Sequence, residues 1–335
     1  MGFSLAMATP DTTVDRAEAL AESILPDRTQ KLRMLVIVNP YATTVSARLK
    51  NLVVYALQGR YEVEAIDTEA QGHATEICRE AAHEGYDVVV AFGGDGTVNE
   101  AANGLVGSQT PLSCLPGGAT NVYARTLGIP GDVVDATEHM LRMADTFEPR
   151  HVDLGRVDDR WFTFSAGAGL DASVVERVDS RPTLKSRGGE WYYTWSAIST
   201  FNRRYLVNPP QVRVEAGGRV AEGVTVIVQN SDPYTYFGRR PIRIATDAGL
   251  ESGALDLTVL TRATPLEVPT MMARVFSGDP ARVQRHRNLE EFPAVPRATL
   301  SAVEGTFPVQ VDGDYIGRYE RAELTVKPRG LKVVS

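Results

Sequence analysis

The 335-residue sequence has only two cysteines, Cys78 and Cys114, so it cannot form a disulfide framework, and a reducing cytoplasmic compartment is expected. Long apolar runs are also lacking, because pieces such as LVIV and VVVAF fall far short of the roughly 20 residues of a transmembrane helix. Any membrane contact is therefore expected to be peripheral. Positive charge is in deficit, with 35 Lys plus Arg against 42 Asp plus Glu and a net charge of -7. This balance argues against a nucleic-acid partner held by a general positive field.

Several familiar ligand signatures are absent as well. No lysine follows a glycine, which excludes a Walker A loop, and the five histidines show neither HExxH nor a paired spacing typical of a metal site. One dinucleotide-like stretch, GAGLDA at 167–172, does follow a strand-like segment. No second strand is expected within about thirty residues after it, so we interpret it as close packing of a strand on a helix, with an oxidoreductase as the alternative.

The patterns divide the chain into three parts. Residues 1–30 carry five acids against two arginines and have no signal-peptide pattern, so they are expected to form a weakly ordered leader. From 31 to 149, short apolar runs alternate with helical stretches of about a dozen residues, which predicts an α/β domain with a parallel sheet. From 150 to 321, alternation around Gly-Gly and Asp-Gly turns predicts a mainly antiparallel β domain. Residues 322–335 are expected to pack back on the first domain, and a cleft between the domains is the expected ligand site.

The loop FGGDGTVNE, from Phe92 to Glu100, comes where a buried strand is expected to end and a helix to begin. At that place in an open α/β sheet, backbone amides and a helix N-terminus face an anionic ligand. Gly93, Gly94 and Gly96 permit positive φ and a close approach to phosphate oxygens. Asp95 would repel those oxygens unless a cation lies between, so it predicts Mg²⁺ as well as a nucleotide. A tight glycine turn with a capping Asp is the alternative reading.

A second glycine turn, LPGGATN, follows the strand-like run PLSCL. Gly117 and Gly118 come at the carboxyl end of that strand, and Thr120 and Asn121 are expected to open a helix. An ordinary capped helix start is the alternative for this segment alone. Because the carboxyl ends of parallel strands meet at one edge of a sheet, the donors of both loops should face the same crevice. The pair of loops therefore favours a nucleotide cleft.

The motifs GGDGTVNEAANGL and LPGGATNVYARTLGIP, with Val38, Asn39 and Pro40 on the first strand, resemble the soluble lipid kinase family of bacterial diacylglycerol kinases and their sphingosine and ceramide kinase relatives. The resemblance runs from about residue 32 to about 330. It implies a fold like that of the NAD kinases and diacylglycerol kinases, with ATP and Mg²⁺ as cofactors and Asp95 toward the metal. The segment NPYAT lacks the Ser-Gly that commonly follows Asn-Pro in the family. The implied nucleotide-binding positions are Asn39, Pro40, Tyr41, Ala42, Thr43, Thr68, Gly93, Gly94, Asp95, Gly96, Thr97, Val98, Asn99, Glu100, Gly117, Gly118, Thr120 and Asn121.

The motif QVDGDYIG at 310–317 is by itself a hairpin signal, since Asp-Gly between alternating apolar residues is typical of a tight turn. The resemblance implies a further role, because the family has an Asp-Gly-Glu here that faces the phosphoryl acceptor. In this chain Asp314 replaces the Glu. A hydroxyl that attacks a γ-phosphate needs a carboxylate within hydrogen-bond reach to take its proton. Asp312 and Asp314 are both candidates for this base, and the position favours Asp314.

Three other segments bear on ligands. The turn at 247–257 resembles a family turn that binds a structural magnesium, but Ser252 stands where the family has Asp, so no second metal is predicted. An aromatic helix is expected at about 189–204, where core packing is favoured over lipid contact. The basic stretch at 180–189 is read either as a solvated loop or as a lid that attracts phosphates or anionic headgroups.

The sequence thus predicts a cytoplasmic, ATP- and Mg²⁺-dependent lipid kinase, peripherally associated with the inner face of the membrane, which phosphorylates the hydroxyl of diacylglycerol or a related lipid alcohol to phosphatidic acid. The expected partners are a lipid substrate at the membrane surface and a second copy of the chain, with no nucleic acid. The alternatives are an NAD kinase-like enzyme, a sphingosine- or ceramide-type kinase, and a non-catalytic nucleotide or lipid sensor. The LPGGATNVYARTLG segment looks like the lipid kinases rather than the NAD kinases.

Overall fold

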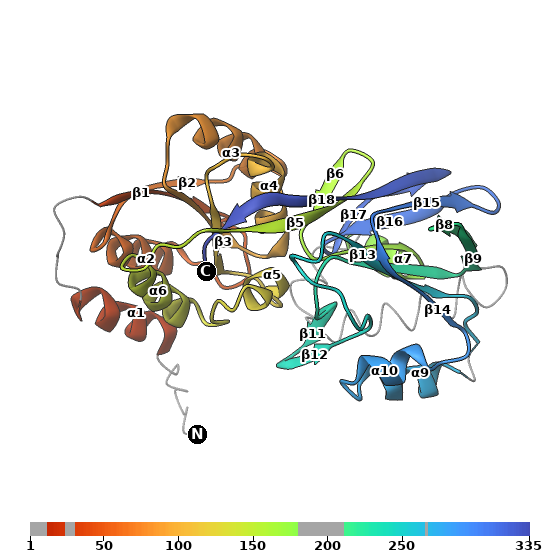
Figure 1. Cartoon of the computed structure of the whole chain (residues 1–335). Helices are drawn as coiled ribbons and strands as arrows, with labels where there is room; N and C mark the ends of the chain where they lie inside the picture. The colour runs from red at the N-terminus through yellow and green to blue at the C-terminus, as the bar shows by residue number, and fades with distance from the viewer. Residues whose placement is uncertain (1–11, 24–30, 180–210, 265–266) are drawn as a thin grey trace, which may run out of the picture.

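The computed structural model describes residues 12–23, 31–179, 211–264 and 267–335, which form two lobes side by side (Figure 1). The first lobe is an open parallel sheet, as the sequence predicts, with strand order β2-β1-β3-β4. Its strands read as continuous apolar runs because both faces of the sheet are covered, and every residue of β3 is buried. The strands are β1 (Leu32–Val38), β2 (Tyr61–Asp67), β3 (Val88–Gly93) and β4 (Leu112–Pro116).

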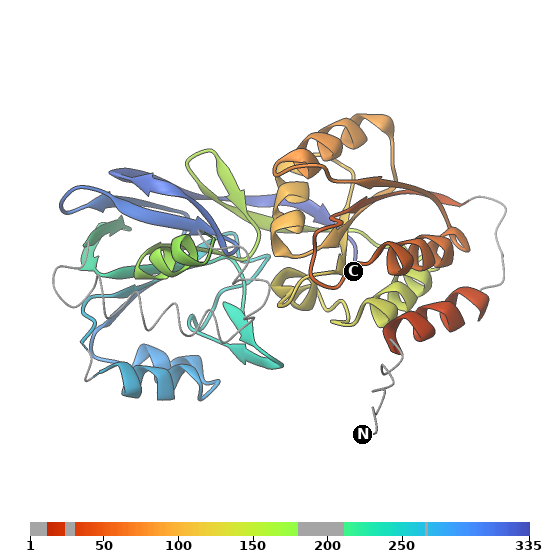
Figure 2. The ribbon, with the colours of Figure 1, turned by 180° about the vertical axis from the view of Figure 1, so that it is seen from behind.

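Helices cover both faces of this sheet. Their ranges are α2 (Ala47–Gln58), α3 (His73–Glu84), α4 (Asp95–Leu105), α5 (Val122–Thr126) and α6 (Val133–Met143). Helices α3 and α4 pack together on one face, and α2 and α6 pack together on the other (Figure 2). Helix α4 follows β3 with only Gly94 between them, so its N-terminus lies at the carboxyl edge of the sheet.

Helix α1 (Thr12–Ser23) packs against α2 and α6, within the stretch that the sequence assigns to a weakly ordered leader. The structure differs from that expectation because the charges of the segment have partners. Glu18 pairs with Arg48 of α2, and Arg16 pairs with Asp132 and Asp135 beside and within α6. These partners are distant in sequence, so local composition does not reveal them.

The second lobe is a sandwich of antiparallel strands, which confirms the prediction for the C-terminal half. One of its sheets has the order β14-β13-β10-β7-β16-β17, a second joins the sheet of the first lobe, and β11 pairs with β12 in a small third sheet. The strands are β5 (Arg150–Val157), β6 (Arg160–Phe162), β7 (Ser165–Gly169), β8 (Val212–Ala216), β9 (Arg219–Gly223), β10 (Thr225–Gln229), β11 (Thr235–Phe237), β12 (Arg240–Ile242), β13 (Leu255–Leu260), β14 (Leu289–Val295), β15 (Arg297–Ala302), β16 (Phe307–Val311), β17 (Asp314–Tyr319) and β18 (Arg321–Val333). The helices are α7 (Leu170–Asp179), α9 (Val268–Val275) and α10 (Pro280–Gln284).

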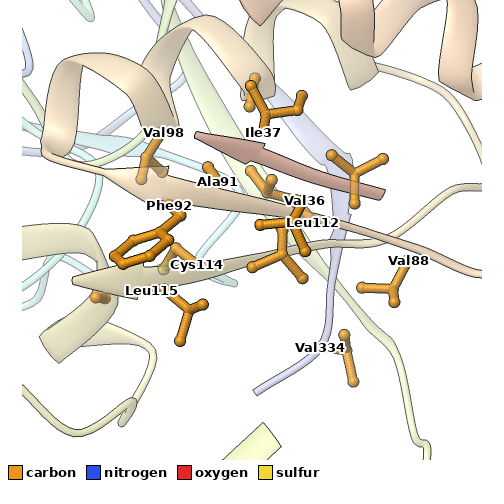
Figure 3. Close-up of a cluster of buried hydrophobic side chains, with 14 of the residues drawn as sticks. Val36, Ile37, Val88, Ala91, Phe92, Val98, Leu112, Cys114, Leu115 and Val334 are labelled. Carbon is orange, nitrogen blue, oxygen red and sulfur yellow. The ribbon is translucent and has the colours of Figure 1, made fainter. Parts of the chain in front are cut away.

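Strand β18 belongs to both lobes. Its first residues pair antiparallel with β15 in the second lobe, and its last residue, Val333, pairs in parallel with Leu112 of β4. Strand β5 runs antiparallel along most of its length. Val334 lies beside the side chains of Leu112 and Val88 in the core of the first lobe (Figure 3). One sheet therefore continues from the first lobe into the second, which holds the two sides of the candidate site in register.

Candidate active site

The two glycine loops pack backbone against backbone at the carboxyl edge of the parallel sheet. The amide of Gly117 donates to the carbonyl of Gly93 at 2.8 Å. A Cβ atom on Gly118 would lie 2.8 Å from the Cα of Gly94, a distance that no side chain tolerates. None of these four glycines has a positive φ, nor does Gly96, so the sequence-based argument from positive φ is wrong. Glycine is required at positions 117 and 118 because a Cβ atom there would come within 3.0 Å of the backbone of the first loop.

Asp95 fastens one loop to the other. Its Oδ2 accepts the amide hydrogen of Val122 and its Oδ1 that of Tyr123, each at 3.0 Å. These are the first two amides of α5, so Asp95 caps that helix from the first turn of α4. Burial raises the pKa of Asp95 to about 6, against the opposing effect of the two amide hydrogen bonds. Asp95 therefore does act as a helix cap, as in the alternative reading of the sequence, but for the neighbouring helix α5. Each carboxylate oxygen of Asp95 keeps a second lone pair that could bind a ligand.

The segment after β1 lies against the same two loops. Asn39 Nδ2 donates to Thr97 Oγ1 at 3.1 Å, and Asn39 Oδ1 accepts the amide hydrogen of Tyr41 at 2.9 Å. The amide of Thr44 donates to the carbonyl of Gly117 at 3.1 Å, which ties the end of this segment to the second loop. The ring of Tyr41 stands in solvent, 83% exposed. The short segment containing Pro40, Tyr41, Ala42 and Thr43 therefore forms one wall of the site.

The remaining predicted nucleotide positions lie beside these loops. Thr68 follows β2 and donates its amide hydrogen to the carbonyl of Val38 at 2.8 Å, at the same edge of the sheet. Asn121 closes the second loop on itself, since its Oδ1 accepts from the Gly118 amide at 2.9 Å and its Nδ2 donates to the Gly118 carbonyl at 2.7 Å. Helix α5 begins one residue later, at Val122, with Asn121 in the left-handed conformation and Thr120 in the loop before it. The structure thus brings all three predicted segments to one place.

Three of the predicted nucleotide residues have side chains that are engaged elsewhere. Val98 is buried in the core of the first lobe. Glu100 accepts the amide hydrogens of Gly72 at 2.8 Å and Ala74 at 3.3 Å, so it holds the N-terminus of α3. Asn99 is fully buried and faces the second lobe. These side chains support the site from behind, because their hydrogen bonds or apolar surfaces already have partners.

Asp312 joins the two lobes. It is 4% exposed, and its carboxylate accepts five hydrogen bonds. Oδ1 accepts from the amides of Phe164 and Ser165, and Oδ2 accepts from the amide and hydroxyl of Thr163 and from Asn99 Nδ2, all at 2.7 to 3.1 Å. Burial raises the pKa of Asp312, and the backbone hydrogen bonds act in the opposite direction. With its lone pairs occupied, Asp312 is poorly placed to take a proton from a substrate.

Asp314 lies on the other side of the same turn and faces the first glycine loop. A Cβ atom on Gly96 would stand 3.0 Å from Asp314 Oδ2, so the carboxylate rests against the first turn of α4. The positive end of the helix dipole stabilises a negative charge there. Asp314 and Asp312 also contribute to the raised pKa of Asp95, which indicates that the three carboxylates share one electrostatic environment. Of the two candidate bases, the geometry favours Asp314.

Two residues at the junction of the lobes were missed by the sequence analysis. Asn103 Nδ2 donates to the carbonyl of Trp161 at 3.1 Å, and Asn103 Oδ1 accepts the amide hydrogen of Trp161 at 3.1 Å. The same carbonyl accepts from Asn99 Nδ2 at 2.9 Å. Asparagines four residues apart on α4 share one face of the helix, and this spacing is the signal that could have revealed the junction.

Other motifs have simpler explanations or are outside the described residues. Strand β7, which contains the first three residues of GAGLDA, has antiparallel neighbours on both sides, so the stretch is no βαβ fingerprint. In the 247–257 turn, Ser252 Oγ donates to the carbonyl of Ala254 at 2.9 Å, and the amide of Gly253 donates to Asp153 at 2.6 Å. The predicted aromatic helix at 189–204 lies outside the described residues, as does the whole basic stretch at 180–189.

Neither a preformed metal site nor a membrane-spanning helix is present in the described part of the chain. No group of three or more His, Cys, Asp or Glu side chains in the described part of the chain has an arrangement that could hold a metal ion. A cation near Asp95 would therefore need most of its ligands from phosphate and water. Within the same ranges, none of the helices has the length and apolar character needed to cross a bilayer.

Comparisons with protein families agree with this architecture. Residues 33–157 match the model of the diacylglycerol kinase catalytic domain, and residues 164–335 match that of the YegS C-terminal NAD kinase beta sandwich-like domain. A diacylglycerol kinase of Bacillus subtilis (strain 168) is 32% identical over 225 residues, which are 65% of this chain and 70% of that protein. A diacylglycerol kinase of Staphylococcus aureus (strain bovine RF122 / ET3-1) is 27% identical over 292 residues, covering 85% of this chain and 87% of that protein.

Solved structures show the same fold. One crystal structure of a Bacillus anthracis str. Sterne protein has a TM-score of 0.72 at 23% identity and covers 92% of this chain and 96% of its own. Another, of a diacylglycerol kinase from the same strain, has a TM-score of 0.64 at 19% identity and covers 92% of this chain and 98% of its own. The two-lobed arrangement described above is therefore shared along nearly the whole length of these chains.

Proposed function

As a member of the diacylglycerol kinase family, this chain is a lipid kinase, and we propose that it transfers the γ-phosphoryl group of ATP to the hydroxyl of diacylglycerol, giving phosphatidic acid. The observation that carries the proposal is the position of Asp314. This carboxylate comes from the second lobe and stands against Gly96, in the glycine loop of the first. An acceptor that enters from the second lobe would meet a nucleotide on the loops beside this carboxylate.

The nucleotide is proposed to bind on the two packed glycine loops. Their backbones lie at the carboxyl edge of a parallel sheet, where α4 also begins, and this is the common place for phosphate in such folds. The wall that contains Asn39 and Tyr41 lies against the same loops. Asp95 fixes α5 to the first loop, which keeps the two loops in one geometry when the ligand arrives.

The donor set fits Mg²⁺ at this place. Asp95, Asp312 and Asp314 interact closely enough for the latter two to raise the pKa of the first, and carboxylate oxygens are the ligands that Mg²⁺ prefers. Asp95 would hold the ion, together with phosphate oxygens and water, which leaves Asp314 available as a base. When bound, the ion would neutralise charge on the triphosphate.

Asp314 is proposed as the general base. Its carboxylate would take the proton of the lipid hydroxyl while that oxygen forms a bond to the γ-phosphorus. The bond from the γ-phosphorus to the bridging oxygen of ADP breaks in the same displacement, and ADP leaves. Most of the rate enhancement in such transfers comes from alignment of the reactants and stabilisation of charge. A general base adds a factor of about 10² to 10⁴ in rate. Asp312 would hold the lobes together, since its oxygens already accept five hydrogen bonds.

The chain is further proposed to act in the cytoplasm, at the inner face of the membrane where its substrate resides. We also propose that two copies of the chain associate as a homodimer. Neither proposal requires a segment that crosses the bilayer.

Transfer of labelled phosphate from ATP tests the proposed function. Mixed micelles containing diacylglycerol, sphingosine or ceramide, and a separate reaction with NAD, serve as acceptors. We expect labelled phosphatidic acid as the main product, and a loss of kcat of about 10² or more in Asp314→Asn with little change in the KM for ATP. Labelled NADP as the main product would instead support an NAD kinase, an alternative that fits the match of residues 164–335 to an NAD kinase beta sandwich-like domain. ATP binding without transfer to any acceptor would support a sensor.

A further inference from the structure

A buried glutamine connects the turn that carries Asp314 to the body of the second lobe. Gln310, on β16, is 2% exposed. Its Oε1 accepts the amide hydrogen of Gly313 at 2.9 Å, and its Nε2 donates to Asp171 Oδ2 at 2.8 Å. Gly313 is the residue between Asp312 and Asp314. The side chain of Gln310 therefore spans from the middle of that turn to a carboxylate on α7.

Asp171 is itself held from several directions. Tyr234 donates its hydroxyl hydrogen to Asp171 Oδ1 at 2.6 Å, and the amide of Asp171 donates to Thr225 Oγ1 at 3.0 Å. Burial raises the pKa of Asp171, while the hydrogen bonds from Tyr234 and Gln310 lower it. Both carboxylate oxygens thus have a donor, one from each neighbour, and Asp171 cannot rotate without losing one of them.

The glycine at position 167 leaves space for this contact. A Cβ atom there would overlap Asp171 Oδ2 and would lie 2.8 Å from Gln310 Nε2. The first glycine of GAGLDA, which resembled part of a dinucleotide fingerprint, is thereby explained by the meeting of these two side chains. Helix α7 also touches the other strand of the hairpin, since Glu176 pairs with Arg318 of β17 at 3.7 Å.

The hairpin needs such a constraint because its ladder is irregular close to the turn. The register of β16 against β17 shifts between Val309 and Gln310, and bulges of this kind bend a strand and redirect its side chains. Asp312 and Gly313 both have positive φ, so the two-residue turn itself has a defined shape. The irregular strand pair alone does not fix the orientation of this turn. Asp314 is one methylene shorter than a glutamate, so a small displacement of the turn would take its carboxylate out of reach.

We propose that Gln310, Asp171 and Tyr234 form a positioning relay, which fixes the Asp312–Asp314 turn and thereby sets where the Asp314 carboxylate stands over α4. None of the three is a catalytic residue in this scheme, because each acts through the turn. The inference rests on the proposed role of Asp314 as the base. A displacement of a reacting group by about 1 Å can cost about 10² in rate, so removal of the relay should be visible in kcat.

An exchange of the carboxylate and the amide tests the relay. In Gln310→Glu two carboxylates face each other, and we expect kcat to fall by about 10- to 100-fold, with the KM for ATP within twofold of wild type. The double variant D171N/Q310E restores one amide and one carboxylate in reversed order. The new amide on α7 can then accept from Tyr234 and donate to the new carboxylate on β16, which still accepts from Gly313, so kcat should return to within about threefold of wild type. Gln211→Glu adds a carboxylate at an exposed position and should match wild type.

Two results would overturn the relay. One is a change of side chain without the expected kinetic effect, either wild-type kcat in Gln310→Glu or a folded double variant as slow as the single one. The other is a loss of kcat that only follows a loss of melting temperature and ATP affinity, since a purely structural role predicts that pattern.

A second cycle separates this inference from the proposed function. If the relay acts through Asp314, then D314N/Q310E should be no slower than D314N alone, and additive losses would contradict the relay. Full activity of D314N would overturn the assignment of the base itself, whatever the Gln310 variants do.

Discussion

Asn99 Nδ2 donates to Asp312 Oδ2 at 2.8 Å, and this buried hydrogen bond joins the two lobes across 213 positions of sequence. The relationship separates the two aspartates of the Asp-Gly-Asp turn. One faces inward and accepts five donors, whereas the other faces the glycine loop. The same short motif therefore supplies both a structural junction and a candidate base.

Asp312→Asn is expected to lower stability strongly. An amide in place of the carboxylate turns one acceptor into a donor, which would then face groups that also donate. The loss in unfolding free energy should be about 3 kcal/mol or more, measured by urea denaturation. Asp159→Asn, at a fully exposed carboxylate, is the matched control and should stay within about 0.5 kcal/mol. A large loss of kcat at unchanged stability would instead make Asp312 the base.

Gly118→Ala should separate the two glycine loops. The new methyl group would meet the backbone of Gly94 at 2.8 Å, so one loop has to move. We expect the Kd of an ATP analogue, measured by calorimetry, to rise by about tenfold or more, since the phosphate donors would no longer be aligned. Gly131→Ala is the control, because nothing lies within 4 Å of its Cβ position and its φ is ordinary. Equal affinities of the two variants would argue against a phosphate site on these loops.

Gly96→Ala should uncouple stability from activity. Alanine in the first turn of α4 favours the helix by up to about 1 kcal/mol over glycine. Its methyl group would, however, come within 3.0 Å of Asp314 Oδ2 and push the carboxylate away. The expected result is an unchanged or higher melting temperature together with a kcat reduced by about tenfold or more. A variant that is both as stable and as active as wild type would show that Asp314 acts from another position.

The raised pKa of Asp95 predicts a pH dependence of stability. Its pKa rises from 3.8 to about 6 on folding, so between these values the folded state binds more protons than the unfolded state. The contribution of Asp95 to stability therefore falls as pH rises from about 4 to about 6. Asp95→Asn removes this titration, and the wild-type stability relative to the variant should decline over that window in urea titrations. A difference that stays constant with pH would contradict a raised pKa.

Local patterns predicted most of the fold. The apolar run VVVAF became the central strand β3, and the glycine turns came at the carboxyl ends of β3 and β4, because burial on both faces and strand-to-helix turns leave a signal in a few neighbouring residues. The partners of buried polar groups leave no such signal. Nothing near Asp95 indicates that it caps α5, and nothing near Asp312 indicates its bond to Asn99. Such contacts depend on how distant elements are stacked, which local spacing does not encode.

The path of β18 has a consequence for biosynthesis. The outer neighbour of β4 is supplied by residues near position 333, some two hundred positions downstream of that strand. During translation, the first lobe emerges from the ribosome long before β18 has been synthesised. Until then β4 is an exposed edge strand with unpaired backbone groups. We therefore expect chaperones to bind the exposed edge of the nascent chain until residues 321–333 have left the exit tunnel and can pair with it.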